Sequence, residues 1–304
     1  MADGSLSRVL VTGGAGFIGR RLVRVLLDHG HEVISADRHA CTDERASSVV
    51  GDLRDPAVIA DAVRPATDVI VHLAAVTSVL RSAADPVGTY QLNVEATASL
   101  LEHARKRDVG VFLLASTNAV VGDVGTAAIT EQTPLRPLTP YGATKAAAEM
   151  LLSGYAASYG LTGAALRFSN VYGPGMEAKD SLVPRLLRAA RDGKGIQIYG
   201  DGTARRDLVH VDDVVSGILT AWLARHNGPL ILGSGESVAV NDIVEAARSV
   251  TGAELPAEHI PPKPGEMPAV IIDISAARAL GYAPRFDLKA GIATVWPEFS
   301  ETAR

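Results

Sequence analysis

Cysteine is almost absent from this chain, since Cys41 is the only one among 304 residues. One cysteine cannot form a disulfide within the chain, which excludes the class of small secreted domains held together by disulfides. No stretch approaches the ~20 consecutive apolar residues of a membrane-spanning helix. Residues 1–7 also lack the charged start and apolar middle of a signal peptide. We therefore expect a cytoplasmic protein that does not enter a membrane.

Positively charged residues are also fewer than negatively charged ones. The 29 Lys and Arg residues are outnumbered by 34 Asp and Glu residues, which gives a formal net charge of −5 and an isoelectric point near 5.9. Such a chain has no overall attraction for nucleic acid or an anionic membrane, so any anionic ligand must be held by a local site. Asp212 and Asp213 begin a predicted helix, and we expect them to cap its N-terminus. We expect no metal site.

Glycine is concentrated where a phosphate-binding turn needs it. Residues 8–11 form a short, β-branched apolar run suited to a buried parallel strand, and apolar residues recur at helical spacing over 22–27. Three glycines lie between them at intervals of three. Glycine allows the backbone to turn tightly and approach a diphosphate, and the N–H groups that open a helix attract negative charge. The residues expected at a dinucleotide cofactor are Gly13, Gly16, Phe17, Ile18 and Gly19.

Acidic residues at the ends of the next two predicted strands indicate which dinucleotide binds. Asp37 ends the second strand, where a carboxylate can accept both ribose hydroxyls of an adenosine, which favours NAD. Arg38 could instead meet the 2′-phosphate of the phosphorylated cofactor, and Asp37 could simply cap a loop, so both alternatives stay open. Asp52 and Leu53 follow the third strand and are expected at the cofactor, where the Asp52 carboxylate is placed to bind an adenine amino group; taken alone, the segment is also an ordinary turn.

The fourth predicted strand, 69–75, ends in two small residues. Ala74 and Ala75 would let the backbone pass close to a flat ligand, and we expect them beside the cofactor together with Leu73. His72 lies inside the apolar run, where a packed core histidine is a simpler interpretation than a catalytic one.

A helix is predicted over 90–104 from its apolar stripe, and Asn93 within it is interpreted as structural. The next predicted strand, 111–117, ends in two hydroxyl residues, Ser116 and Thr117. Ligand groups gather beyond the carboxyl ends of parallel strands, so both hydroxyls are expected to face the cofactor.

Tyr141 and Lys145 form a candidate catalytic pair. They lie four residues apart in a predicted helix and therefore project from one face. A phenol ordinarily ionises near pH 10, and we expect the Lys145 ammonium group and an oxidised nicotinamide to lower the pKa of Tyr141. The phenolate could then remove a hydroxyl proton while a hydride leaves the same carbon.

Taken together, these residues resemble the extended short-chain dehydrogenase/reductase family, in its branch of NAD-dependent sugar-nucleotide epimerases and dehydratases. The resemblance covers nearly the whole chain. It rests on TGGAGFIG at 12–19, GDL at 51–53, HLAA at 72–75, NV at 93–94, YGATK at 141–145, RFSNVYGPG at 167–175 and RDLVHVDD at 206–213.

This resemblance implies the roles of the catalytic residues. Thr117, Tyr141 and Lys145 would form a triad, in which Thr117 hydrogen-bonds the reacting sugar oxygen and Lys145 also holds the nicotinamide ribose. The cofactor implied is NAD. The substrate implied is a nucleoside-diphosphate sugar.

Three residues are implied to bind that substrate. Asn170 would contact the nucleotide diphosphate and Arg206 a phosphate oxygen. Lys263 stands where relatives commonly have an arginine that binds phosphate, and lysine keeps the charge without the bidentate geometry.

The implied fold is α/β, a Rossmann-type doubly wound parallel sheet with a smaller, partly discontinuous C-terminal substrate lobe. We expect residues 1–170 to form the NAD-binding domain, with 208–233 packing back on it, and residues 171–304 to form the substrate lobe. The family commonly dimerises through paired helices, so we expect a homodimer formed through 90–104 and 144–159.

The chain departs from the family pattern directly after Thr117. Sugar-nucleotide 4,6-dehydratases usually have an Asp-Glu pair there, and decarboxylating relatives have a Glu at the second position, whereas this chain has Asn118 and Ala119. Neither side chain can act as a general acid or base, which disfavours elimination and decarboxylation. The function expected is 4-epimerisation through a transient 4-keto sugar. Reduction of a 4-keto sugar by NAD(P)H and non-catalytic dinucleotide binding stay open as alternatives.

Overall fold

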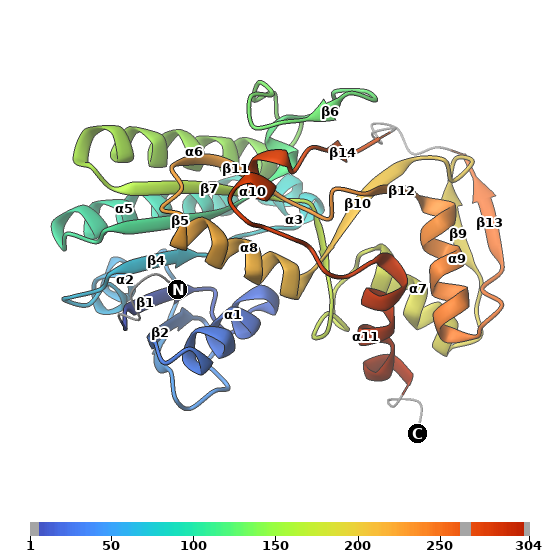
Figure 1. Ribbon diagram of the computed structural model, residues 1–304, viewed down its shortest axis with the longest axis horizontal. Coiled ribbons are helices and arrows are strands. Elements are labelled where there is room, and N and C mark those ends of the chain that lie inside the picture. The colour runs from blue at the N-terminus through green and yellow to red at the C-terminus, as the bar shows by residue number, and fades with distance from the viewer. Residues whose placement is uncertain (1–5, 262–268, 301–304) are drawn as a thin grey trace.

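The computed structural model describes residues 6–261 and 269–300, and its largest element is a seven-stranded parallel sheet (Figure 1). The strand order is β3-β2-β1-β4-β5-β7-β11, so the order reverses between β1 and β4. This confirms the predicted doubly wound sheet, in which ligands bind where the order reverses. The strands are β1 (Arg8–Thr12), β2 (Glu32–Asp37), β3 (Ser47–Val50), β4 (Val69–His72), β5 (Val111–Thr117), β7 (Thr162–Phe168) and β11 (Gly228–Leu232).

Helices cover both faces of this sheet (Figure 1). The strands read as nearly continuous apolar runs because both of their faces are buried. One face packs against α1 (Phe17–Asp28) and α8 (Val211–Leu223). The other packs against α2 (Pro56–Ala62), α5 (Ala96–Lys106) and α6 (Pro140–Tyr159).

A smaller lobe has its own apolar core, formed chiefly by three helices that lie together in Figure 1. These helices are α7 (Leu182–Arg191), α9 (Val240–Thr251) and α11 (Leu288–Ser300). Two small sheets accompany them, one of β8 (Asn170–Tyr172), β10 (Arg205–His210) and β12 (Ser237–Ala239), the other of β9 (Ile196–Tyr199) and β13 (Ala257–Ile260). Further elements are α3 (Val79–Ala84), α4 (Pro86–Tyr90), the 3-10 turn η2 (Asn118–Val120), β6 (Ala128–Ile129), β14 (Ile271–Ile272) and α10 (Ser275–Ala279).

The helix predicted over 90–104 differs from expectation. A π-helical turn, Gln91–Glu95, separates α4 from α5. The turn contains Asn93, whose side chain accepts a bond from Val76 N (2.8 Å) and donates to Val76 O (3.0 Å). Asn93 thus supports the loop after β4, as its structural interpretation predicted. The fourth strand is also shorter than predicted, because the backbone leaves the sheet after His72.

Asp212 and Asp213 lie in the first turn of their helix, α8 (Val211–Leu223), as expected, but neither of them is its N-cap. The N-cap of α8 is His210, whose ring nitrogen accepts the N–H of Asp212 at 3.2 Å. The Asp212 carboxylate instead pairs with Arg21 on α1. Buried Asp213 accepts the backbone N–H groups of Arg285 and Phe286 at 3.0 and 3.2 Å, so it joins α8 to the segment before α11.

His72 is a core histidine, as its position in an apolar run predicted. Its side chain is fully buried and lies between Thr12 Oγ1 (2.6 Å) and Thr97 Oγ1 (3.0 Å). Thr97 Oγ1 donates to Asn93 O at 2.8 Å, which assigns the ring hydrogen of His72 to Nε2. Burial, and secondarily the charge of Lys145, lowers the pKa of His72 to about 3.

His72 should make the fold sensitive to mild acid. The unfolded histidine titrates near its model value of 6.5, whereas the folded one resists protonation until about pH 3. The unfolded state therefore binds the extra proton, and stability is lost as the pH falls from 6.5 toward 3 by about 1.4 kcal/mol per pH unit. We expect urea unfolding between pH 7 and 5 to show this slope, and His72→Gln to flatten it.

An exposed histidine offers the matched control, because His29→Gln changes the same residue type outside the core. An unchanged pH slope in the His72→Gln protein would contradict the assignment of the titration to His72.

Candidate functional site

The carboxyl end of β5 and the first turns of α6 form the centre of the site. Pro140 occupies the first turn of α6, and Thr139 caps it by accepting the N–H of Gly142 at 3.1 Å. Tyr141 and Lys145 then follow on one face of the helix. The Lys145 side chain is buried, and its ammonium group donates to Ala115 O of β5 at 2.8 Å. This bond holds α6 against the strand that ends in Thr117.

The acidities at this centre are set first by burial. Burial lowers the pKa of Lys145 to about 8, and the charge of Glu149 works in the opposite direction. Burial raises the pKa of Tyr141, against a smaller lowering by its hydrogen bond with Thr117. The expected lowering of the Tyr141 pKa by Lys145 is therefore not found in the protein itself, because the ammonium group is directed at Ala115 O. Tyr141 and Thr117 are thus within hydrogen-bonding distance of each other.

Ser116 does not face the same way as Thr117, so its expected place at the cofactor is wrong. Successive side chains in a strand point to opposite faces. The buried Ser116 hydroxyl donates to Glu149 Oε1 on α6 at 2.5 Å. Arg167 on β7, which pairs with Ser116 in the sheet, donates to the same carboxylate. Sequence reasoning missed Glu149, although it continues the four-residue spacing of Tyr141 and Lys145.

The glycine-rich loop is built for close approach to a ligand. Gly13 has a φ of +71°, and a Cβ added there would lie 2.8 Å from Ala74 N. Gly16 is the N-cap of α1, and glycine has no side chain that could cap the helix. Among the described residues, no other side chain caps α1 either. The backbone N–H groups at Phe17 and Ile18 are thus left for another acceptor, and the loop fits the diphosphate of a dinucleotide. Gly19 is buried where α1 packs against Gly13.

Asp37 lies against this loop at the end of β2. Its two carboxylate oxygens accept the backbone N–H groups of Ala15 and His39, each at 3.2 Å. A carboxylate has about four acceptor positions, so two stay open for ribose hydroxyls. Asp37 therefore shapes the loop, as its alternative interpretation held, and still fits the role of ribose ligand. Arg38 beside it is exposed.

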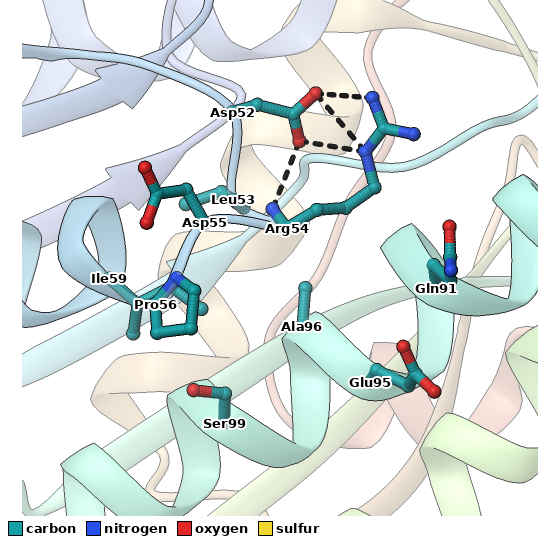
Figure 2. A pocket seen from close by; sticks show the side chains of 10 residues that line it. All are labelled: Asp52, Leu53, Arg54, Asp55, Pro56, Ile59, Gln91, Glu95, Ala96 and Ser99. Carbon is teal, nitrogen blue, oxygen red and sulfur yellow. Dashed lines mark hydrogen bonds and ion pairs between the residues drawn. The ribbon is translucent and has the colours of Figure 1, made fainter.

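A cavity of about 580 Å³ lies next to Asp52 (Figure 2). Asp52 and Leu53 form one side of it, and Gln91, Glu95 and Ser99 lie on the helical side. The Arg54 guanidinium group chelates the Asp52 carboxylate at 2.6–3.1 Å and lowers its pKa to about 2. An adenine amino group would therefore share this carboxylate with Arg54, a residue that sequence reasoning missed.

The residues after β4 complete the cofactor side. Leu73, Ala74 and Ala75 are partly buried, and Leu73 N donates to Thr12 O at 3.1 Å. Ala74 N donates to Thr12 Oγ1 at 3.3 Å, so this segment lies directly beside Gly13. Its small side chains keep the approach to the loop open.

Two expected substrate ligands lie on adjacent strands of the smaller lobe. Asn170 on β8 is exposed, and its amide donates to Asp207 O at 2.9 Å. Arg206 on β10 is partly buried, and one of its nitrogen atoms donates to Arg205 O at 2.8 Å. β8 and β10 pair in parallel, which brings the two side chains to one region. Lys263 lies outside the described residues.

The position of the dehydratase acid pair has no carboxylate. Asn118 is buried, and its amide has no hydrogen-bond partner among the described residues, whereas Ala119 bonds to Thr117 only through its backbone N–H. In the same part of the chain, no group of three or more His, Cys, Asp or Glu side chains is placed to hold a metal ion. None of the described helices is long and apolar enough to span a membrane.

Among the known proteins similar to this chain over nearly their whole length are a UDP-glucose 4-epimerase and a dTDP-glucose 4,6-dehydratase. A putative UDP-glucose 4-epimerase from Methanocaldococcus jannaschii is 33% identical over 295 residues, which covers 94% of this chain and 96% of the relative. A dTDP-glucose 4,6-dehydratase from Streptomyces griseus is also 33% identical, over 94% of this chain and 92% of the relative. Identity alone therefore does not separate epimerase from dehydratase.

Solved structures agree closely in fold. The UDP-glucose 4-epimerase of Thermotoga maritima, crystallised with UDP-glucose, has a TM-score of 0.92 at 30% identity and covers 98% of this chain and 100% of its own. The UDP-glucose 4-epimerase of Thermus thermophilus, crystallised with NAD, has a TM-score of 0.89 at 32% identity and covers 96% and 98%. The model of the NAD dependent epimerase/dehydratase family matches residues 9–233. The resemblance inferred from the sequence is thus confirmed, and the chain belongs to the NAD dependent epimerase/dehydratase family.

Proposed function

We propose that this chain is an NAD-dependent nucleotide-sugar 4-epimerase. The observation that carries the proposal is the convergence of Thr117, Tyr141 and Lys145 at the carboxyl edge of the parallel sheet, the edge that also carries the glycine-rich loop, with no carboxylate at residues 118 and 119. Thr117, Tyr141 and Lys145 together provide the groups that are needed to move a hydroxyl proton. The missing carboxylates argue against elimination, which needs a second acid-base pair.

The cofactor would be held by residues at the carboxyl edge of the main sheet. The N–H groups at Phe17 and Ile18 would bind its diphosphate, Asp37 its adenosine ribose and Asp52 its adenine. When bound there, NAD supplies an acceptor for the hydrogen on the sugar C4 carbon and returns it as hydride. The protein's own residues handle the accompanying proton.

Tyr141 is the proposed base for the C4 hydroxyl proton. Its raised pKa makes it a poor base in the protein alone, so positive charge near the phenol is needed to favour the phenolate. Lys145 supplies one such charge as long as it is protonated. Thr117, which bonds Tyr141, would hold the sugar oxygen while the proton moves. Reversal of these steps on the opposite face of a transient 4-keto sugar gives the epimer.

The substrate proposal is a nucleoside-diphosphate sugar bound between the lobes. The Thermotoga maritima structure with UDP-glucose supports a UDP-sugar. Asn170 and Arg206, on paired strands, would contact the diphosphate. In this proposal residues 1–170 form the cofactor domain together with 208–233, residues 171–304 form the substrate lobe, and the enzyme works in the cytoplasm.

A homodimer is also proposed, through the outer surface of the α4–α6 layer. Helices α5 and α6 lie side by side on one face of the molecule (Figure 1). Four large apolar side chains of this layer are between 47% and 66% exposed: Val87, Tyr90, Met150 and Tyr159. Exposed apolar residues grouped on neighbouring helices are typical of a protein interface.

The activity can be tested directly. The purified protein, incubated with UDP-, dTDP- and GDP-sugars without added cofactor, should form C4 epimers detectable by NMR or chromatography. In a parallel assay with added NAD(P)H and a 4-keto sugar nucleotide, consumption of one NAD(P)H per product would instead identify a 4-ketoreductase, and retained NAD without turnover would identify a binding module. Tyr141→Phe should lower kcat by about 10³-fold because the proton acceptor is lost. Tyr159→Phe removes a hydroxyl from the far end of the same helix and should leave kcat unchanged.

The glycine-rich loop gives a second prediction. Gly13→Ala should destabilise the fold by roughly 1–3 kcal/mol, because an alanine is strained at positive φ and crowds Ala74. It should also reduce the NAD that copurifies, measured after acid release. Gly154→Ala, in α6, has nothing within 4 Å of the added methyl group and should stabilise the helix by about 0.5–1 kcal/mol. Equal effects of the two substitutions would show that the Gly13 conformation is not required.

Met150→Glu tests the dimer. A charge within the proposed interface should weaken association by roughly tenfold or more, seen as a smaller mass in sedimentation at micromolar concentration. Leu223→Glu is the control, because Leu223 is similarly exposed but lies on α8, on the other face of the sheet. A wild-type protein that is monomeric at these concentrations would refute the dimer.

A further inference from the structure

A buried ion pair lies one helical turn from the proposed catalytic lysine, Lys145. Glu149 and Arg167 have side chains that are 3% and 4% exposed, and the Arg167 Nη2 atom lies 2.8 Å from Glu149 Oε2. A second Arg167 nitrogen, Nε, lies 3.1 and 3.3 Å from the two carboxylate oxygens. Ser116 donates to the remaining side of the carboxylate at 2.5 Å. The Glu149 carboxylate is therefore fully held in one orientation.

Two adjacent residues of β5 hold the Glu149–Arg167 pair and Lys145 in fixed positions relative to each other. Ala115 accepts the Lys145 ammonium group through its carbonyl, and Ser116 binds Glu149 through its hydroxyl. Lys145 and Glu149 are one helical turn apart on α6. Two consecutive residues of β5 therefore bond to side chains from two consecutive turns of this helix. Arg167 completes the arrangement from β7, where it pairs with Ser116, and its third nitrogen donates to Glu131 O at 3.2 Å.

Stability alone is a weak explanation for this arrangement. Removing two charges from water is expensive, and a buried ion pair is often no more stable than apolar side chains of the same volume. The pair does, however, control the charge around Lys145. Lys145, Glu149 and Arg167 together carry one positive charge, whereas without Glu149 two cations would be buried in the same region.

We propose that Glu149 is a positioning residue of this site, whose carboxylate, held by Ser116 and Arg167, keeps the Lys145 ammonium group protonated and directed at the end of β5. This inference rests on the proposed function, since it concerns the charge that Tyr141 needs. Burial already lowers the pKa of Lys145 to about 8, and Glu149 is the group that counteracts this lowering.

Other charged or titratable groups surround Lys145, and each has a defined effect. His72 on β4 is neutral above about pH 3 and adds no charge. Arg167 on β7 is a cation, but its charge is directed into Glu149. Tyr141, on the same helix, is neutral in the resting protein because burial raises its pKa. Glu149 is thus the nearby anion on which the Lys145 charge depends.

Glu149→Gln tests the inference. The amide has the same shape but no charge, so Lys145 should lose its proton at lower pH. We expect the alkaline limb of the kcat profile, which falls as the pH rises through the Lys145 pKa, to move toward acid by about one unit or more. KM should change less than kcat, because Glu149 does not touch the substrate.

A direct titration separates this inference from the proposed function. The chain has six lysines, so ¹³Cε-lysine labelling gives few NMR signals, and Lys145→Arg identifies the signal of Lys145. The Lys145 signal should titrate at lower pH in the Glu149→Gln protein than in wild type. The titration needs no turnover. An inactive wild-type enzyme would therefore contradict the epimerase proposal, but the effect of Glu149 on Lys145 could still be measured.

A double variant guards against a protein that fails to fold. Glu149→Gln with Arg167→Gln removes both charges and leaves no unpaired buried cation. Its Lys145 titration should lie between those of wild type and Glu149→Gln. Glu102→Gln removes an ion-paired but surface carboxylate on α5 and should change nothing at Lys145. Wild-type titration of Lys145 in both Glu149 variants would overturn the proposal.

Discussion

The bond from the Lys145 ammonium group to Ala115 O is the interaction on which the site depends. It joins the first turns of α6 to the end of β5, and thereby brings Tyr141 from the helix to Thr117 from the strand. Neither residue is reactive alone. A buried phenol is a weaker acid than one in water, and a threonine hydroxyl is a poor base. In the proposed mechanism, the Lys145 ammonium group supplies positive charge that favours the phenolate.

The cost of this arrangement explains why the surroundings of Lys145 are so heavily bonded. A buried ammonium group is destabilised by the loss of water, and the fold compensates with a carbonyl at one side and an anion one helical turn away. That anion must itself be satisfied, which requires Ser116 and Arg167. The polar groups under the site therefore form one connected set whose members stabilise each other.

Those parts of the fold and site that depend on local patterns could be predicted from the sequence. The strand, glycine turn and helix at the N-terminus follow from spacing, and so do the Tyr141–Lys145 pair and the burial of His72. Predictions failed where a side chain had several partners to choose from. Ser116 bonds Glu149, and Asp213 accepts a backbone N–H group 72 residues away. Which hydrogen-bond partner a side chain takes depends on its neighbours in the tertiary structure. Neither secondary-structure propensity nor hydrophobic periodicity in the sequence reveals those neighbours.

The position of β11 has a consequence for how the chain can be divided. This strand follows the smaller lobe in sequence, yet it pairs with β7 over five residues and forms the border of the main sheet. A fragment ending after β8 would leave β7 as an uncovered edge, with its backbone hydrogen-bonding groups free to recruit a strand from another molecule. The polypeptide's return to its first sheet thus covers the edge of β7, and the seven-stranded sheet is completed only after more than 220 residues have been synthesised.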